Sequence, residues 1–252
     1  MTTTRFKKGS AASKEARVSI DNRHRSLVPQ TFPVPAVPQS TSPVPWLLSL
    51  HGAEGRGDYG DPKYRGNCSG LLIRDLVQFF KPKHVLDPMS GSGTCGDVCK
   101  ELGIRFRSFD LRTGFDAGNV QHFDGLGLFD FIWLHPPYWK LISYGVDPRC
   151  LSNAPTLADF TARLRVVLRN CLNVLAPDGK LAILMGDLKH CGEYCGLPFR
   201  TFNAAVKEGC WLAAPDIIRF SHGATSSSKS YPFPLIPRLH DTCFVLKKKA
   251  AA

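Results

Sequence analysis

The sequence predicts an α/β fold in which a mostly parallel sheet is covered by helices on both faces. Short apolar runs alternate with segments of helical periodicity along most of the chain, and this alternation is typical of strands joined by crossover helices. Polar clusters follow three predicted strands, directly after Leu86, Phe109 and Leu134. Ligands of such sheets lie at the carboxyl ends of the strands, so we expect the functional site there.

The first half of the predicted fold begins with a helix, indicated by apolar residues at helical spacing from Leu71 to Phe80. Pro82 ends this helix, because proline cannot continue the helical hydrogen-bond pattern. A short β run at 84–86 then ends at Asp87. The next predicted elements are a glycine loop, a helix at 95–102 and strands at 104–109 and 129–134.

The second half begins with a long helix at 157–175, in which apolar residues recur every three or four positions. The turn Pro177-Asp178-Gly179 leads into a strand at 180–185. A helix at 199–208 and strands at 211–220 and 242–246 complete the prediction.

Composition indicates one large domain with a basic tail. The chain has 252 residues, of which 43% are hydrophobic, and this is enough for a sizeable core. No apolar run has the length that a bilayer crossing needs, and the N-terminus lacks the apolar core of a secretory signal. We therefore expect a cytoplasmic protein. The net charge of +11 favours a polyanionic partner such as nucleic acid, although only weakly.

We divide the chain into an N-terminal arm, 1–45, and a folded domain, 46–249. The arm is basic and then rich in proline, and such a segment buries too little apolar surface to offset the entropy lost on ordering. We expect it to be disordered. Two roles are open for it, a solvated leader or an arm that contacts nucleic acid through its lysines and arginines.

The nine cysteines indicate reduced thiols rather than disulfides or metal ligands. Their number is odd and they are spread along a chain expected to be cytoplasmic. Two local pairs, Cys95/Cys99 and Cys191/Cys195, have no matching second pair at zinc-finger spacing. We predict no metal site.

The glycine loop runs from Asp87 to Thr94, between a strand and a helix. Gly91 and Gly93 allow a tight turn and a close approach of the backbone to a ligand. With Gly96 as a third glycine, the spacing of the glycines nearly matches the sequence pattern of dinucleotide-binding loops. A carboxylate at the end of the strand would repel a pyrophosphate, however, and would attract a cation. Asp87 therefore favours S-adenosylmethionine, whose methionine end is cationic.

Two further carboxylates extend this predicted cofactor site. Asp110 follows the next strand, about 20 residues on, where an acidic side chain binds ribose hydroxyls. Asp116 is placed to accept a hydrogen bond from the adenine amino group. For both residues the alternative is a structural role as a helix cap or turn residue.

The double-proline segment His135-Pro136-Pro137-Tyr138 follows the strand at 129–134. Two prolines stiffen the chain and direct backbone carbonyls toward the cleft. Hydrogen bonds from an aromatic amine to two fixed acceptors would make its nitrogen more nucleophilic. A neighbouring aromatic ring can stack on a base that has been removed from a nucleic-acid helix. The segment therefore indicates methyl transfer to an exocyclic amine.

The glycine loop and the double-proline segment resemble those of the amino-directed DNA methyltransferases, which act on adenine N6 or cytosine N4. The resemblance covers roughly 62–247, and within this range it also rests on the segments 64–69, 175–181, 185–187 and 238–241. It implies a Rossmann-like class I methyltransferase fold, with a seven-stranded sheet and an antiparallel last strand. The cofactor residues it implies are Asn67, Asp87, Pro88, Ser90, Gly91, Gly93, Thr94, Asp110 and Asp116, and the catalytic residues are His135, Pro136, Pro137 and Tyr138.

Two departures from the family pattern are present. The catalytic motif begins with His135, where the family has Asp, Asn or Ser; a neutral imidazole can accept one hydrogen bond, and the Pro136 carbonyl can accept another. The chain also has little room for a separate target-recognition domain, so base recognition is expected from loops 140–156 and 221–238. The second of these loops offers Lys229 and Tyr231.

We therefore predict an S-adenosylmethionine-dependent DNA methyltransferase, with adenine N6 favoured over cytosine N4. One alternative is the same chemistry on RNA. Another is a catalytically weak regulatory protein that binds the cofactor and DNA, for which His135 would be the sign. The sequence does not indicate the oligomeric state.

Overall fold

The computed structural model describes residues 40–52, 55–220, 234, 236 and 238–249. The chain divides into two compact units, 1–40 with 223–238 and 41–222 with 239–252. All the elements given below lie in the second unit. Most of the predicted arm at 1–45 and most of the predicted loop at 221–238, with Lys229 and Tyr231, lie outside the described residues.

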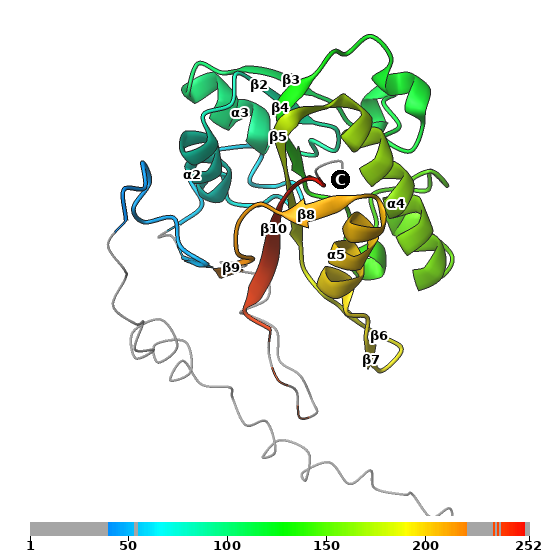
Figure 1. Cartoon of the computed structure of the whole chain (residues 1–252). Helices are drawn as coiled ribbons and strands as arrows, with labels where there is room; N and C mark the ends of the chain where they lie inside the picture. The colour runs from blue at the N-terminus through cyan, green and yellow to red at the C-terminus, as the bar shows by residue number, and fades with distance from the viewer. Residues whose placement is uncertain (1–39, 53–54, 221–233, 235, 237, 250–252) are drawn as a thin grey trace, which may run out of the picture. The chain divides into compact units, whose positions relative to one another are not determined.

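A central sheet organises the larger unit (Figure 1). Its strands are β1 Leu50–His51, β2 His84–Asp87, β3 Arg105–Ser108, β4 Phe129–Leu134, β5 Leu175–Met185, β8 Cys210–Leu212, β9 Ile217–Phe220 and β10 His240–Lys248. Seven of them follow one another in the order β1-β9-β10-β5-β4-β2-β3, and β8 pairs with β10 beside this path. A separate hairpin consists of β6 Lys189–His190 and β7 Glu193–Tyr194.

The sheet is mostly parallel, as predicted. Strands β3, β2, β4 and β5 pair in parallel, and so do β1 and β9. The last strand, β10, is antiparallel to β5, β8 and β9, which agrees with the implied antiparallel last strand. The fold is therefore the Rossmann-like α/β class expected from the sequence.

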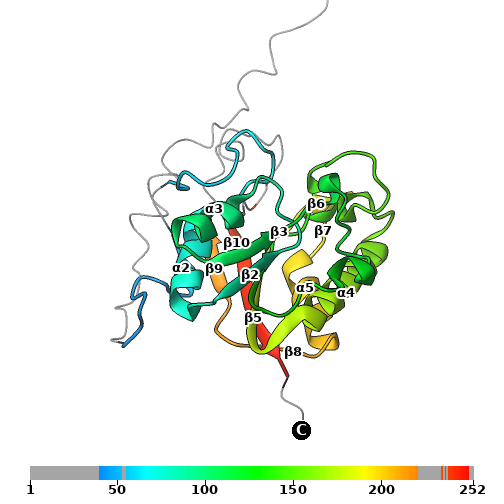
Figure 2. The same cartoon turned by 90° about the horizontal axis from the view of Figure 1, so that it is seen from above.

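Within the residues that the structure describes, four α-helices cover the two faces of this sheet. They are α2 Gly70–Phe80, α3 Thr94–Glu101, α4 Leu157–Val174 and α5 Leu197–Lys207. Figures 1 and 2 show α2 and α3 on one side of the sheet and α4 and α5 on the other. Short 3₁₀ helices at Leu111–Thr113, Val120–Phe123, Trp139–Leu141 and Leu151–Asn153 complete the described structure.

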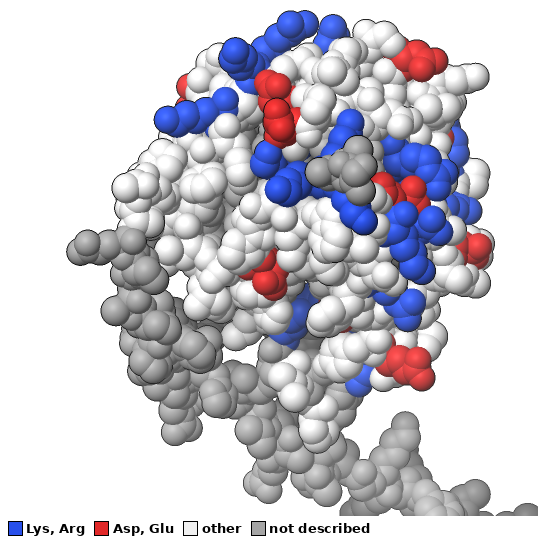
Figure 3. Space-filling view, viewed as in Figure 1, with Lys and Arg blue, Asp and Glu red and all other residues white. Residues whose placement is uncertain are grey.

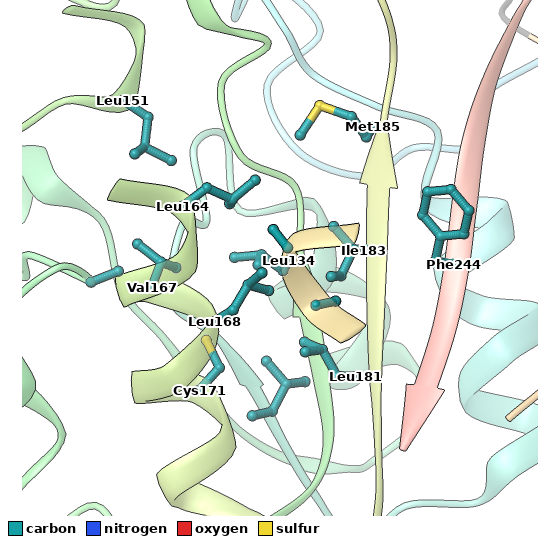
Figure 4. Close-up of a cluster of buried hydrophobic side chains, with 14 of the residues drawn as sticks. Leu134, Leu151, Leu164, Val167, Leu168, Cys171, Leu181, Ile183, Met185 and Phe244 are labelled. Carbon is teal, nitrogen blue, oxygen red and sulfur yellow. The ribbon is translucent and has the colours of Figure 1, made fainter. Parts of the chain in front are cut away.

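The side-chain alternation of the strands divides the core into two layers. In β5, Leu181, Ile183 and Met185 face the layer under α4 and α5, as Figure 4 shows, whereas Ala182 and Leu184 face the layer under α2 and α3. Because both faces of the central strands are buried, these strands read as nearly continuous apolar runs.

Local signals account for most of the element boundaries. Helix α4 begins with a capping box, in which the Thr156 side chain accepts from the Asp159 backbone N–H and the Asp159 carboxylate accepts from the Thr156 backbone N–H. Helix α2 ends at Lys81, which is in the left-handed conformation, directly before Pro82. The predicted helices and strands agree with these elements to within a few residues.

Two predicted strands are wrong in their extent. Strand β5 begins at Leu175, five residues before the predicted strand at 180–185, so the predicted turn at 177–179 lies within it. The segment predicted as one strand at 211–220 forms two strands, β8 and β9, which both pair with β10. Pro215 lies between them, and proline has no N–H to donate to a sheet. The sequence prediction also missed β1 and the β6–β7 hairpin, each of whose strands has two residues.

No helix in the described part of the chain has the length and apolar character that crossing a membrane requires.

Candidate cofactor and acceptor site

A pocket of about 500 Å³ lies at the carboxyl ends of β2, β3 and β4. All of the predicted cofactor residues except Gly93 line it, together with His135 and Pro137. Pro136 and Tyr138 are not among its lining residues. The structure therefore gathers most of the predicted cofactor and catalytic residues around one cavity.

Backbone hydrogen bonds join the glycine loop to the residue that follows β3, Phe109. Ser90 N–H donates to the Phe109 carbonyl at 2.8 Å, and Phe109 N–H donates to the Asp87 carbonyl at 2.8 Å. Gly91 and Gly93 have φ values of 51° and 87°, which side chains with a Cβ rarely adopt. Gly93 is also the N-cap residue of α3, and so it shapes the loop without lining the pocket.

The Asp87 carboxylate is buried without a basic partner. Its side chain is at the end of β2, the residue is only 3% exposed, and Oδ1 accepts from Met89 N–H at 3.1 Å. Among the described residues, no lysine or arginine forms an ion pair with it. The pKa of Asp87 is raised to about 7, mainly by burial; the Met89 hydrogen bond opposes this rise, and the negative charge of Asp110 contributes to it. Such a carboxylate is suited to bind a cationic group.

Asp110 links the glycine loop to the segment after β3. Its Oδ2 accepts from Gly91 N–H at 2.9 Å, and its Oδ1 accepts from the backbone N–H and Nε of Arg112 at 3.0 and 2.8 Å. An ionised carboxylate offers about four acceptor positions, so one remains for a ligand. Asp110 therefore caps the 3₁₀ helix Leu111–Thr113, the structural alternative considered from the sequence, and it also lines the pocket.

Asp116 occupies a turn at another part of the pocket wall. Its Oδ1 accepts from Gly118 N–H at 2.8 Å, and its backbone N–H donates to His122 Nδ1 at 2.7 Å. Nearby, the Phe109 and Phe115 rings stack with centroids 4.4 Å apart and an angle of 8°. Phe115 and Asp116 both line the pocket, which gives it an apolar surface beside a hydrogen-bond acceptor.

Asn67 joins the loop before α2 to the start of α3. Its Oδ1 accepts from Thr94 Oγ1 at 2.5 Å, and its Nδ2 donates to the Asp61 carbonyl at 2.7 Å. Both side chains line the pocket. Asn67 and Thr94 therefore hold this loop against the glycine loop.

Sequence reasoning missed a ladder of side chains that lines the same pocket. The Arg112 guanidinium lies 4.7 Å from the centroid of the Tyr64 ring. The Tyr64 and Tyr144 rings stack with centroids 6.0 Å apart. Tyr64 and Tyr144 come from two separate loops and Arg112 from the 3₁₀ helix Leu111–Thr113, so no local spacing connects them. Gly91 lies beside the Tyr64 ring, but the sequence linked this glycine only to a ligand.

The His135 imidazole lies at the end of β4 and faces the pocket. Its Nε2 is 3.0 Å from Tyr138 Oη, and the two rings meet edge to face. Burial, and to a lesser extent the positive charge of Arg219, lower the pKa of His135 to about 4, and the charge of Asp241 opposes this shift. The imidazole is therefore neutral near pH 7. Among the described residues, its Nδ1 has no hydrogen-bond partner.

Tyr138 lies behind His135 rather than along the pocket. A Cβ on Gly186, the residue after β5, would collide with the Tyr138 ring and with the Asp241 carboxylate. Gly186 thus allows the ring to pack closely against the sheet. Stacking of Tyr138 on a target base stays a prediction.

The described residues include all nine cysteines, and every one is a free thiol. Cys68 and Cys95 line the pocket, and burial raises the pKa of Cys68 to about 11, which keeps it protonated. In the described part of the chain, no cluster of His, Cys, Asp and Glu has the arrangement of a metal site.

No known family description matches the sequence, and no curated protein matches it either. Among solved structures, TrmN from Thermus thermophilus is 18% identical over 73% of this chain and 50% of its own length, with a TM-score of 0.41. A putative DNA modification methylase, also from Thermus thermophilus and complexed with S-adenosyl-L-methionine, is 19% identical over 54% of this chain and 52% of its own, with a TM-score of 0.37. The ribosomal protein L11 methylase from Lactobacillus delbrueckii subsp. bulgaricus is 13% identical over 80% and 93%, with a TM-score of 0.42.

The chain spans about half the length of TrmN and of the DNA modification methylase. Identities and TM-scores this low assign no substrate to the chain.

Proposed function

We propose that this chain is an S-adenosylmethionine-dependent methyltransferase that acts on an exocyclic amine of a nucleic-acid base, with DNA adenine N6 favoured. The observation that carries the proposal is one pocket, at the ends of β2 and β4, which contains both an uncompensated buried carboxylate, Asp87, and a neutral imidazole, His135. The first suits a cationic cofactor, and the second suits an amine donor.

The pocket residues fit the three parts of this cofactor. Asp87 would bind the cationic methionine end, Asp110 has one acceptor position left for a ribose hydroxyl, and Asp116 would accept from the adenine amino group. The stacked Phe109 and Phe115 rings supply an apolar surface near Asp116. When bound, S-adenosylmethionine supplies an electrophilic methyl group on a positively charged sulfur.

His135 acts in this proposal as a hydrogen-bond acceptor and not as a proton store. An imidazole whose pKa is about 4 carries almost no second proton at pH 7, so one of its ring nitrogens keeps a free lone pair. In the tautomer that donates from Nε2 to Tyr138 Oη, the Nδ1 lone pair is free to accept from the target amine. Together with the Pro136 carbonyl, this arrangement would orient the nitrogen, and catalysis would consist largely of positioning.

The charge of the protein supports a polyanionic substrate. The net charge is +11, and Figure 3 shows lysine and arginine side chains gathered on the upper part of the face that it presents. Because the end of β10 pairs with the beginning of β5, the lysines there lie at the opposite edge of the sheet from the pocket. Arg112, Arg149 and Arg163 line the pocket itself. Basic groups attract phosphates without regard to sequence, so they favour nucleic acid and do not distinguish DNA from RNA; the resemblance of the motifs favours DNA.

The hydrogen bond between His135 Nε2 and Tyr138 Oη also allows a second candidate, a catalytically weak protein that binds the cofactor and DNA. If Tyr138 donates to His135 Nε2, then Nδ1 carries the ring proton and cannot accept from an amine. The acceptor site would then lack its first group.

The test is transfer of labelled methyl from S-adenosylmethionine to unmethylated DNA, with total RNA in parallel, followed by nucleoside analysis. Label in N6-methyladenine or N4-methylcytosine from DNA would support the proposal and identify the base. Asp87→Asn should weaken cofactor binding at least about 10-fold and lower transfer with it, whereas Asp124→Asn, which changes an exposed carboxylate, should alter neither. Label in RNA alone would transfer the proposal to RNA, and cofactor binding without any transfer would favour the second candidate.

A further inference from the structure

A buried ion pair links the last two strands of the main sheet behind the double-proline segment. Arg219 on β9 lies opposite Asp241 on β10, and the guanidinium and the carboxylate form an ion pair. Each residue is 8% exposed. The desolvation of two charges usually offsets most of their attraction, and apolar residues of similar size often replace such pairs at no cost in stability. Stability is therefore a weak explanation for this pair.

The pair is adjacent to the acceptor side of the pocket. The Asp241 carboxylate and the Tyr138 ring both lie against Gly186, where a single added Cβ would collide with the two of them. The charge of Arg219 acts on Tyr138 and on His135, and that of Asp241 acts on His135. The His135 Nε2 to Tyr138 Oη hydrogen bond of 3.0 Å thus lies beside the ion pair.

We propose that Arg219 and Asp241 are positioning residues of the acceptor site, which hold the Tyr138 ring in place and, through the Tyr138 hydroxyl, orient the His135 imidazole. This inference rests on the proposed function for its catalytic consequence. Neither residue lines the pocket, so neither touches the cofactor or the target base. The antiparallel pairing of β9 with β10 holds Arg219 opposite Asp241. The Asp241 carboxylate lies against Gly186, as does the ring of Tyr138 from the segment that follows β4.

The two charges also determine the electrostatic environment of His135. Arg219 on β9 disfavours a second proton on the imidazole, Asp241 on β10 favours it, and Tyr138 shares the hydrogen bond at Nε2. Cys68, from the segment before α2, faces Arg219 but carries a thiol whose pKa is raised to about 11, so it adds no charge at pH 7. Burial has the largest effect on the pKa of His135, and the charges of Arg219 and Asp241 have smaller, opposing effects.

Arg219 has a polar atom that packing alone does not explain. Its Nε is buried without a hydrogen-bond partner among the described residues. A buried donor left unpaired is destabilising, and this cost argues that the guanidinium is retained for a purpose other than stability.

The test compares Arg219→Met/Asp241→Leu, which removes both charges, with Arg219→Lys, which keeps the charge and loses the planar guanidinium. The first readout is the pKa of His135, measured by NMR titration of histidine-labelled protein and assigned with His135→Gln. The other readouts are cofactor affinity, kcat and KM for methyl transfer.

For the double variant we expect a folded protein with wild-type cofactor affinity, a kcat lowered about 10- to 100-fold and a His135 pKa shifted upward. For Arg219→Lys we expect a loss in kcat with a His135 pKa close to that of the wild type. If the double variant keeps the wild-type kcat and His135 pKa, the proposal is wrong. If the double variant does not fold, Arg219→Lys decides: full kcat in that variant contradicts a positioning role for the guanidinium.

The experiment distinguishes failure of the proposed function from failure of this inference. The wild-type protein would then transfer no methyl group to any nucleic acid, while the NMR titration would still report whether the ion pair influences His135. An unchanged His135 titration in the double variant would overturn the inference even where transfer is absent.

Discussion

Asp87 should release a proton when the cofactor binds. The pKa of its buried carboxylate is raised to about 7 from an ordinary value of 3.8, so about 0.9 of the molecules carry this proton at pH 6 and about 0.5 at pH 7. A cationic ligand beside the carboxylate favours the ionised form. Binding should therefore release about 0.9 proton at pH 6 and about 0.5 at pH 7.

The assay is isothermal titration calorimetry of S-adenosylmethionine in buffers whose ionisation enthalpies differ, because the heat then reports the protons released. Asp87→Asn should release no proton and bind at least about 10-fold more weakly, since about 1.4 kcal/mol of charge interaction is enough for that loss. Asp124→Asn should release as many protons as the wild type. Proton uptake, or tight binding by Asp87→Asn, would refute the assignment of Asp87 to the cationic end of the ligand.

Three further predictions concern stability and the acceptor site. The pKa of Asp87 is higher in the fold than in the unfolded chain, so its protonated form contributes stability that is complete below pH 3.8 and is lost as the pH rises through about 7. Asp87→Asn, which carries no charge, should therefore be more stable than the wild type at pH 8 by up to about 4 kcal/mol. Equal urea midpoints for the two proteins would contradict this. Thr156→Ala removes the N-cap of α4 and should lower the free energy of unfolding by about 1 kcal/mol, measured by urea denaturation against the exposed control Thr41→Ala; an unchanged midpoint would show that the cap contributes nothing. Gly186→Ala should displace Tyr138 and lower kcat at least about 10-fold with cofactor affinity unchanged, and a loss of affinity instead would show that the cofactor pocket depends on this glycine.

The local sequence determined most of the secondary structure and the position of the pocket. Strand β4 was predicted with the boundaries that the structure shows, because a strand buried on both faces forms a nearly continuous apolar run, here interrupted only by Asp130, that Pro136 and Pro137 end. The polar residues after β2 and β4 were expected to meet, because parallel strands bring their carboxyl ends to one edge. The division of 211–220 into two strands was also signalled locally, by Pro215, and the prediction overlooked it.

Only the tertiary structure decided the chemical state and the neighbours of these residues. The neutral form of His135 depends on burial and on Arg219 and Asp241, which follow it by more than 80 positions in the chain. The stacking of Tyr64 on Tyr144 likewise joins two loops that no local spacing relates. A sequence pattern reports periodicity and backbone preference, but a pKa depends on which charges and how much solvent surround the group, and packing alone determines both.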